Sequence, residues 1–372
     1  MLATIEEVDR DFQAVRQQVQ SFADDMATEL EKPFSERAPD VAESFTRRAL
    51  ALKQTVTMLV HGATHARAVA MRNAPDDGPE RLRINQIGHA TQDISSRAMS
   101  WRARIDPVTR CFVNQIEGHS VPLYGPEPEP DDPIETVLFL MDRAQVALDY
   151  AANPLDQHED AQTLGCFPDI RLKPSEFSAH ALAAYRVTLA QGLFRRARFL
   201  DVGCGGGGKV LIASQVFQHA DGLEFDPGYA QSARRLLEAT EVENGDILEG
   251  NALEFEGYAN YDVVYFFQPM RDTELLIKLE QRIASSVRPG TVLIAPYLQF
   301  RSRAEDLGCR RMDGHIYIAG ATQTEVDDLQ QEAERKGAKL GDKPKLGAWD
   351  DVWANVLNAF LANGFTLQSG TK

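Results

Sequence analysis

Apolar residues recur at alternating spacings of three and four along the first part of the chain. Between residues 3 and 32 they are Ile5, Val8, Phe12, Val15, Val19, Phe22 and Met26. After a break at two prolines the spacing returns at Val41, Phe45, Leu52, Val56 and Leu59. This period predicts two long helices that pair as an antiparallel hairpin. The stripe serves either the core of a helical bundle or an outward role, as a dimerisation arm or as a lid over a substrate pocket.

The next part of the chain mixes helical segments with breaks. A break at 73–79 precedes a helix over 80–105, which Asp106-Pro107 is expected to interrupt, and residues 111–116 fit either a short strand or another helix. The proline- and acid-rich stretch 125–133 is expected to be a linker. Helices follow at 134–152 and 175–191, the second with Ser175 or Ser178 as its cap, and 153–174 is expected to be irregular.

From residue 198 onward, short apolar runs alternate with helical patterns. The expected strands are 199–202, 220–225, 247–250, 261–267 and 291–298, with helices at 209–217, 227–239 and 273–287. Residues 309–314 and 315–320 are typical of an antiparallel pair that closes the sheet. This alternation predicts an α/β fold with a doubly wound, Rossmann-like, seven-stranded sheet, mostly parallel.

The patterns together predict four regions. Residues 1–124 form a helical N-terminal region, 125–133 a linker, 134–320 the α/β domain, and 321–372 a helical C-terminal appendage with helices at 324–336 and 348–363.

Charge and composition narrow the function classes. The net charge of −16 argues against a nucleic-acid partner, because phosphate neutralisation supplies most of such affinity. The four cysteines lack CxxC spacing, which indicates reduced thiols in a cytoplasmic protein rather than a disulfide framework. No apolar run approaches the roughly 20 residues of a membrane span. His61 and His65 lie four apart in HGATH, which lacks the glutamate of HExxH, so we expect no metal site.

The stretch FLDVGCGGGGKV, residues 199–210, carries the clearest chemistry. Its glycines allow a tight turn and close approach of a ligand to the backbone, and the next helix offers amide groups. GxGxxG alone fits a dinucleotide as well. Asp201 inside the strand can meet an ammonium group, Glu224 at the next strand end can accept from two ribose hydroxyls, and Asn251 can serve an adenine edge. Ribose, adenine and an amino acid are the parts of S-adenosylmethionine.

The motifs FLDVGCGGGG, GLEFDPGYAQSARR, EGNALEF, YDVVYFF and RPGTVLIAPYL resemble, in order and spacing, those of class I S-adenosylmethionine-dependent methyltransferases. The resemblance covers roughly residues 175–320. It implies S-adenosyl-L-methionine as the cofactor, with the methionine part held by Asp201, Gly203, Cys204, Gly205 and Gly207. It further implies that Glu224 binds the ribose, that Phe225 lies against the adenine, that Asn251 and Ala252 read its edge, and that Phe267 and Gln268 complete the cofactor site.

The fourth strand ends in FFQPM, where this family places its acceptor chemistry. The chain departs there from the Asp/Asn-Pro-Pro-aromatic pattern of nucleic-acid amino-methylating enzymes and from the Pro-Cys pair of 5-methylcytosine enzymes. Gln268 is the candidate catalytic residue, orienting a nucleophile through its carbonyl; a helix-capping role fits it equally. His180, Tyr185, Tyr297 and His315 are further candidate bases, and no motif singles one out.

The sequence thus predicts a methyltransferase that acts on an oxygen or nitrogen of a small-molecule acceptor by in-line displacement. A protein methyltransferase, acting on lysine or another amine, is the first alternative. An NAD-dependent oxidoreductase is the alternative of another class, and a non-catalytic scaffold a third. A homodimer through the N-terminal helices is a further expectation.

Overall fold

The computed structural model describes residues 5–72, 75, 77–117, 120–125, 132–167, 172–336 and 351–364. The chain divides into two compact units, the first of Met1–His119 with Ala338–Lys372 and the second of Ser120–Gly337. Most of the expected linker at 125–133, and the segment 337–347, lie outside the described residues. The four-region division made from the sequence therefore stays a prediction.

In its described residues, unit 1 is built from three long helices and several short ones, drawn from both ends of the chain. They are α1 (Ile5–Glu31), η1 (Phe34–Glu36), α2 (Val41–Arg72), α3 (Gly78–Ile116), η3 (Asp351–Trp353) and α12 (Ala354–Ala362). The stripe of α1 from Val8 to Met26 is buried in their shared core. There Phe12 stacks on Trp101 with ring centroids 5.2 Å apart, and Phe45 contacts Phe112 at 4.5 Å. The stripe on α1 therefore serves the core of a bundle.

Pro107 lies inside α3, which continues through it without a break. The expected interruption at Asp106-Pro107 is wrong, and residues 111–116 are helical. Proline inside a helix costs about 3 kcal/mol, because it removes one hydrogen bond and crowds the preceding turn. Ile105, Val108 and Phe112 around it are fully buried, and each such burial contributes about 1.5–3 kcal/mol. Packing on both sides of the proline outweighs the local preference for a break.

Unit 2 contains a seven-stranded sheet in the order β3-β2-β1-β4-β5-β7-β6. Its strands are β1 (Arg198–Val202), β2 (His219–Glu224), β3 (Ile247–Glu249), β4 (Val263–Phe266), β5 (Val292–Ile294), β6 (Cys309–Arg311) and β7 (Ile316–Ala319). The first five run parallel, whereas β7 pairs antiparallel with both β5 and β6. The predicted α/β fold with an antiparallel closing pair is confirmed.

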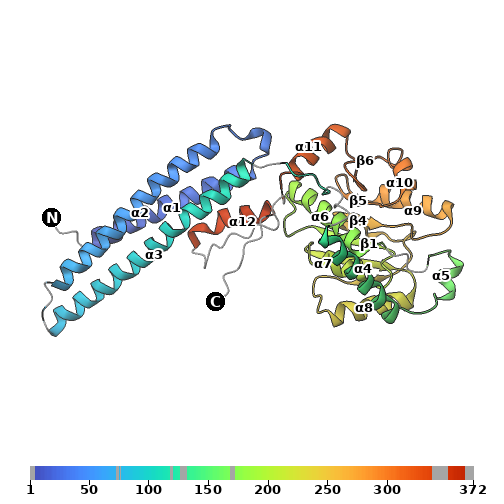
Figure 1. The fold of residues 1–372 in the computed structure, drawn as a ribbon, viewed down its shortest axis with the longest axis horizontal. Helices are drawn as coiled ribbons and strands as arrows, with labels where there is room; N and C mark the ends of the chain where they lie inside the picture. Colours follow the sequence, from blue (N-terminus) through green and yellow to red (C-terminus); the bar gives the residue numbers. More distant parts are fainter. Residues whose placement is uncertain are drawn as a thin grey trace. The chain divides into compact units, whose positions relative to one another are not determined.

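Helices cover both faces of this sheet (Figure 1). One face packs against α6 (Pro174–Ala190), α7 (Gly208–Ser214), α8 (Pro227–Ala239) and α11 (Gln323–Ala333). The other packs against η2 (Gly257–Asn260), α9 (Thr273–Ser286) and α10 (Leu298–Arg303). The remaining helices are α4 (Pro133–Ala152) and α5 (Glu159–Thr163). Within the described part of the chain, no helix combines the length and apolarity that crossing a membrane requires.

The predicted serine cap of α6 is wrong. The helix begins at Pro174 with Lys173 at its N-cap and no side-chain cap bond. Ser175 instead donates its backbone N–H and its hydroxyl to Asp142 of α4, at 3.0 and 2.6 Å. A carboxylate outside the helix thus takes the donors that a local cap would have satisfied, and it ties α4 to α6.

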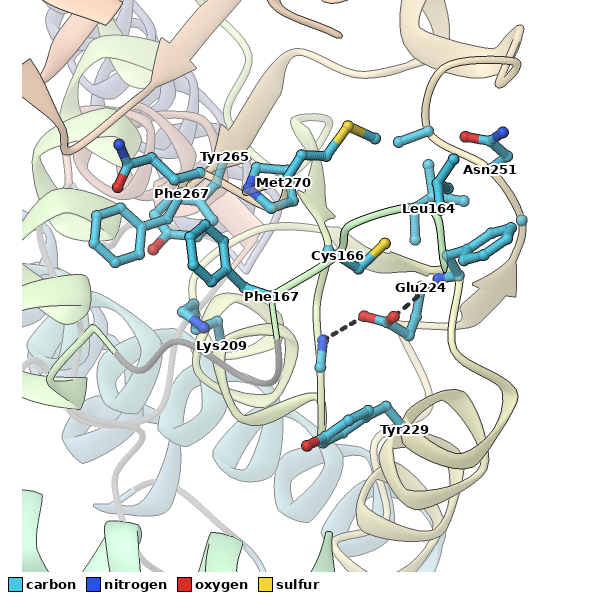
Figure 2. A pocket seen from close by; sticks show the side chains of 18 residues that line it. Leu164, Cys166, Phe167, Lys209, Glu224, Tyr229, Asn251, Tyr265, Phe267 and Met270 are labelled. Carbon is cyan, nitrogen blue, oxygen red and sulfur yellow. Dashed lines mark hydrogen bonds between the residues drawn. The ribbon is translucent and has the colours of Figure 1, made fainter. Parts of the chain in front are cut away.

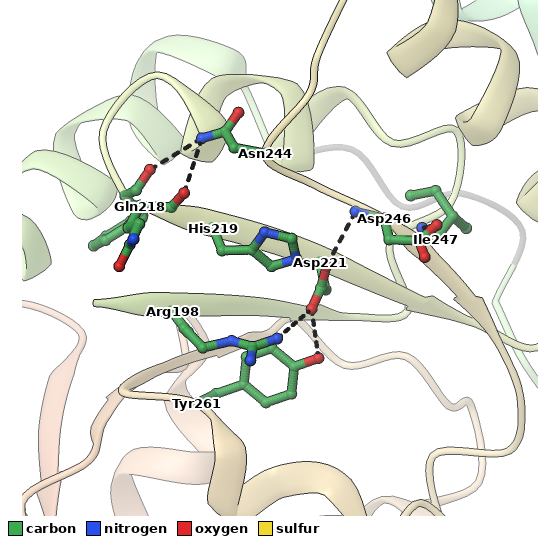
Figure 3. Close-up of polar contacts among 9 residues, drawn as sticks. Arg198, Gln218, His219, Asp221, Asn244, Asp246, Ile247 and Tyr261 are labelled. Atoms are coloured by element: carbon green, nitrogen blue, oxygen red, sulfur yellow. Dashed lines mark hydrogen bonds and ion pairs between the residues drawn. The ribbon is translucent and has the colours of Figure 1, made fainter. Parts of the chain in front are cut away.

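A buried carboxylate joins the strands at the edge of the sheet opposite the glycine loop (Figure 3). Asp221 of β2 accepts from the Tyr261 hydroxyl at 2.7 Å, from Arg198 at 3.3 Å and from the backbone N–H of Asp246 at 3.0 Å. Its other contact is His219, 2.8 Å away. Because every partner comes from a strand or from the segment entering one, this cluster holds the strands in register.

Arg186 of α6 joins the first and last described segments of unit 2. The guanidinium donates to the carbonyls of Val121 and Pro122 at 2.6 and 2.8 Å. It also donates to those of Glu334 and Lys336 at 2.9 and 3.0 Å. The two ends of this unit therefore lie side by side against one buried cation.

Candidate functional site

A pocket lies at the carboxyl ends of β1, β2 and β4, beside the glycine loop (Figure 2). Ligands of open parallel sheets bind at this edge. Its lining comprises Leu164, Cys166, Phe167, Gly203, Gly205, Lys209, Leu223, Glu224, Phe225, Tyr229, Gly250, Asn251, Ala252, Tyr265, Phe267, Gln268, Pro269 and Met270.

Two glycines of the loop are required for different reasons. Gly203 has φ +78°, and a Cβ there would lie 2.9 Å from the Pro269 side chain across the pocket wall. Gly207 has φ +82°, but a Cβ there would meet Ala233 of α8 at 2.8 Å, away from the pocket. Gly203 keeps the pocket open, whereas Gly207 lets α7 approach α8.

Glu224, at the end of β2, fastens the glycine loop. Its Oε2 accepts from the Gly205 N–H at 2.8 Å, and its Oε1 accepts from the N–H groups of Phe225 and Asp226, both at 2.9 Å. Burial raises the pKa of this carboxyl to about 7, against the three amides, which lower it. A carboxylate offers about four acceptor positions. Three are taken, which leaves one on Oε2 for a ligand.

Asn251 and Ala252 lie at the Glu224 end of the pocket, as Figure 2 shows for Asn251. The Asn251 carbonyl accepts from the Leu253 N–H at 3.0 Å, and its amide donates to Glu254 at 3.2 Å. The side chain thus shapes its own loop while facing the pocket. Phe225 also lines this end.

The opposite end of the pocket brings Lys209, Phe167, Tyr265 and Phe267 together (Figure 2). The Tyr265 side chain is buried, and its hydroxyl has no hydrogen-bond partner among the described residues. The Lys209 ammonium lies 5.9 Å from the Tyr265 ring centroid. A buried hydroxyl without a partner is costly, so this pair fits a ligand that brings a hydrogen-bonding, negatively charged group.

Asp201 is the register partner of Tyr265 across β1 and β4, and it is fully buried on the same face of the sheet. It raises the pKa of the Tyr265 hydroxyl, after the larger effect of burial. Asp201 therefore lies behind the lining and acts on the pocket through its charge.

Gln268 has a left-handed backbone, with φ +42°. Non-glycine residues adopt this region at a cost, and such strain gathers at functional sites. The side chain lines the pocket, and its amide donates to Gln299 at 3.2 Å. That bond leaves its carbonyl oxygen available, as the predicted orienting role requires.

A covering segment, Gln157–Phe167, crosses the pocket. The His158 N–H donates to Asp226 at 2.7 Å, the Phe167 N–H to the Pro269 carbonyl at 3.2 Å, and the Arg271 N–H to the Gly165 carbonyl at 2.8 Å. Cys166 faces the pocket from this segment, and burial raises the pKa of its thiol to about 11. The cysteine is thus a neutral wall residue rather than a thiolate nucleophile.

The structure brings most of the predicted site residues together. Eight of them line one pocket, namely Gly203, Gly205, Glu224, Phe225, Asn251, Ala252, Phe267 and Gln268. It does not bring three into the lining: Asp201, Gly207, and Cys204, whose thiol packs on Gly222 of β2.

The other candidate bases do not line the pocket either, namely His180, Tyr185, Tyr297 and His315. His180 is buried beside the Tyr124 hydroxyl at 2.9 Å, and burial, followed by His315, lowers its pKa to about 4. It is therefore uncharged at neutral pH.

Sequence reasoning missed Lys209, Tyr265 and the covering segment. Tyr265 interrupts an apolar strand with a hydroxyl, which is a signal in the sequence, whereas the position of Lys209 after the glycines does not by itself indicate a pocket residue. The covering segment comes from a stretch without periodicity, and no pattern indicated where it would pass.

Residues 144–295 match the family model of protein-L-isoaspartate(D-aspartate) O-methyltransferase. Among solved structures, the YcgJ protein of Bacillus subtilis is 19% identical, over 31% of this chain and 49% of its own, with a TM-score of 0.26. An RNA methyltransferase of Salinibacter ruber, in complex with S-adenosyl-L-homocysteine, is 17% identical, over 40% and 91%, with a TM-score of 0.30. CalS10, an amino pentose methyltransferase of Micromonospora echinaspora, is 19% identical, over 36% and 59%, with a TM-score of 0.26.

This chain therefore covers about half the length of the first of these structures. At such identities and TM-scores, the likenesses say nothing about the acceptor. The family match covers the glycine loop, Glu224, Asn251 and Gln268, so the resemblance to methyltransferases is confirmed, and the NAD-dependent alternative is not supported. Unit 2 carries an S-adenosylmethionine-dependent methyltransferase domain, and S-adenosylmethionine is its cofactor.

Proposed function

We propose that the enzyme methylates an oxygen or nitrogen nucleophile of a small-molecule acceptor. The enclosed pocket carries this proposal. The covering segment is hydrogen-bonded on both sides, to Asp226 and to the loop after β4. Small-ligand sites are concave and bury most of the ligand's surface. The net charge of −16 supports a small acceptor over a nucleic acid.

The residues present fit the cofactor. Glu224 would hold the ribose through its remaining acceptor position, and Asn251 with Ala252 would meet the adenine edge. Lys209 and Tyr265 would take the carboxylate of the amino-acid part, which satisfies the otherwise unpartnered hydroxyl. When bound, the cofactor supplies a methyl group that is already activated by its sulfonium.

The chain's own contribution is to align the acceptor and exclude water. Gln268 would orient the nucleophile through its side-chain carbonyl, which the hydrogen bond from its amide to Gln299 helps to position. Phe167 and Phe267 would form the apolar walls beside the acceptor.

A protein acceptor is the second candidate, and the matched family model favours it, because the enzymes it describes methylate polypeptide carboxyl groups. Incubation with labelled S-adenosylmethionine and a cell lysate, separated into metabolite and protein fractions, tests both. We expect label in the metabolite fraction, and none with Gly203→Val, whose side chain would collide with Pro269. Label confined to polypeptide would contradict the small-molecule proposal and support the second candidate.

A further inference from the structure

Helix α4 turns its apolar side to solvent. None of its residues is buried, and Ile134, Val137, Met141 and Leu148 are 57%, 51%, 62% and 63% exposed. Leu140 lies beside them and is 60% exposed, whereas Phe139, 62% exposed, projects from another side of the helix. A monomer rarely exposes so many neighbouring apolar side chains, and such a patch marks an interaction surface.

The polar side of α4 faces the rest of unit 2. Asp142 accepts both donors of Ser175, and Gln145 and Asp149 lie with it along a cavity wall beside the glycine loop. At the end of the helix, the Ala152 carbonyl accepts from Ser232 at 3.1 Å. These contacts fix the rotation of α4 about its axis and therefore determine that its apolar side faces outward.

The exposed residues follow a heptad pattern. Spacings of three and four connect Ile134, Val137, Met141, Ala144, Leu148 and Ala151. This period keeps one seam of a helix in line with a partner helix. The same pattern on α1 is buried within unit 1, whereas no described residue buries the seam on α4.

We propose that this seam pairs with the α4 seam of a second copy of the chain. Among the faces of this acidic protein, the seam is one where electrostatic repulsion between two copies is small. Two chains of net charge −16 repel each other, but the seam contains no charged residue. The three carboxylates of the helix, Glu135, Asp142 and Asp149, recur every seven residues, which places them together on another side of the helix.

The surface is large enough for such a dimer. A helix of 20 residues is about 30 Å long and about 11 Å across, so its outer half presents roughly 500 Å². A two-fold pair that covered this outer half completely would bury at most roughly 1,000 Å² in total, so the dimer lies at the small end of specific interfaces. The pair is isologous, because the same residues contact each other from both sides.

Sedimentation velocity of the full-length protein over a range of concentrations tests the proposal. We expect the wild type to be a dimer. The double variant Met141→Glu/Leu148→Glu should raise the dissociation constant of the dimer more than about 100-fold, because four carboxylates would be buried between the two copies. The matched control is Met58→Glu/Leu82→Glu, with the same charge change at two exposed residues of unit 1, which should leave the dimer unchanged.

A second variant guards against misfolding. Met141→Gln/Leu148→Gln adds no charge and should weaken the dimer less, while circular dichroism and binding of S-adenosylhomocysteine stay as in the wild type. A wild type that remains monomeric at all concentrations would overturn the proposal. Such a result would also be expected if another part of the same chain covered α4. A dimer that survives the α4 variants, or dissociates with the unit 1 control, would overturn it as well.

Discussion

At the scale of single residues, Glu224 combines two tasks that pull its pKa in opposite directions. Three amides favour the charged form, whereas burial favours the neutral form and raises the pKa to about 7. A ribose hydroxyl that donates to Oε2 would stabilise the charged form. Binding of the cofactor should therefore lower this pKa and release a proton near neutral pH.

Affinity for S-adenosylhomocysteine should thus fall as the pH falls. Below about pH 7 the ligand must displace a proton, so we expect about tenfold weaker binding at pH 6 than at pH 8. Calorimetry in buffers of different ionisation enthalpy should detect the released proton. Glu224→Gln should bind more weakly and lose the pH dependence. A profile for this variant parallel to that of the wild type would show that another group titrates.

Lys209 and Tyr265 allow a separate prediction about the amino-acid end of the cofactor. Lys209→Met and Tyr265→Phe should each weaken binding of S-adenosylhomocysteine about tenfold or more, since hydrogen bonds to charged groups contribute about 1.5–3 kcal/mol. 5′-Methylthioadenosine lacks the amino-acid carboxylate, so its affinity should not change. Lys278→Met, on the exposed side of α9, is the control for lost charge. Equal losses for both ligands would contradict the assignment.

The sequence predicts a pocket residue reliably only where its position along a strand determines that it lies at the pocket. Glu224 ends β2 and Asn251 follows β3, and the carboxyl ends of parallel strands meet at one edge, so sequence order sufficed. Tyr265 required the register between β1 and β4, which places its side chain beside Asp201. The pocket role of Lys209 depends on the side chain reaching past the loop, and no sequence pattern specifies that.

At the scale of elements, Pro107 shows how a core overrides a local signal. Pro107→Ala should restore a backbone hydrogen bond within α3 and stabilise unit 1 by about 1–3 kcal/mol, part of the gain being offset by a more flexible unfolded chain. Urea unfolding followed by the fluorescence of Trp101, buried in the same core, measures this. Arg110→Ala, at an exposed position of the helix, should change stability by less than about 0.5 kcal/mol. A destabilised Pro107→Ala would indicate that the ring itself packs favourably.

The strands of the sheet were predictable because buried parallel strands are short apolar runs between turn residues. α10 (Leu298–Arg303) was not, since the apolar run of β5 continues through Ala295, Tyr297 and Leu298, and the predicted strand therefore extended to residue 298. The start of α6 was missed for a different reason. Asp142, 33 residues earlier, takes the donors of Ser175, and local sequence contains no trace of a partner so distant.

At the scale of the whole molecule, each unit has a hydrophobic core of its own. Both described tryptophans, Trp101 and Trp353, are buried in unit 1, whereas the cofactor pocket lies in unit 2. Fluorescence therefore reports on one unit and ligand binding on the other.

Calorimetric unfolding should show two transitions with different responses to ligand. S-Adenosylhomocysteine at about 100 times its dissociation constant adds about 2.7 kcal/mol to the unit that binds it. For a unit of this size the melting temperature should rise by roughly 5–10 °C. The transition seen by tryptophan fluorescence should stay within about 1 °C. If calorimetry and tryptophan fluorescence report the same single transition, and the ligand shifts it in both measurements, the two units unfold together.

The hydrogen bonds of Arg186 to both ends of unit 2 have a consequence for the order in which the two units fold during translation. Unit 2 is one continuous stretch whose two ends meet on this side chain, so it is complete once residue 337 has been made. Unit 1 must wait, because α12 buries Val356 and Phe360 in the same core as α1. A nascent chain would therefore carry a finished catalytic unit while the helices made first still lack their last partner. A ribosome that stops before residue 351 would release a polypeptide with a complete cofactor pocket and an exposed apolar bundle, which is the kind of surface that makes a chain prone to aggregate.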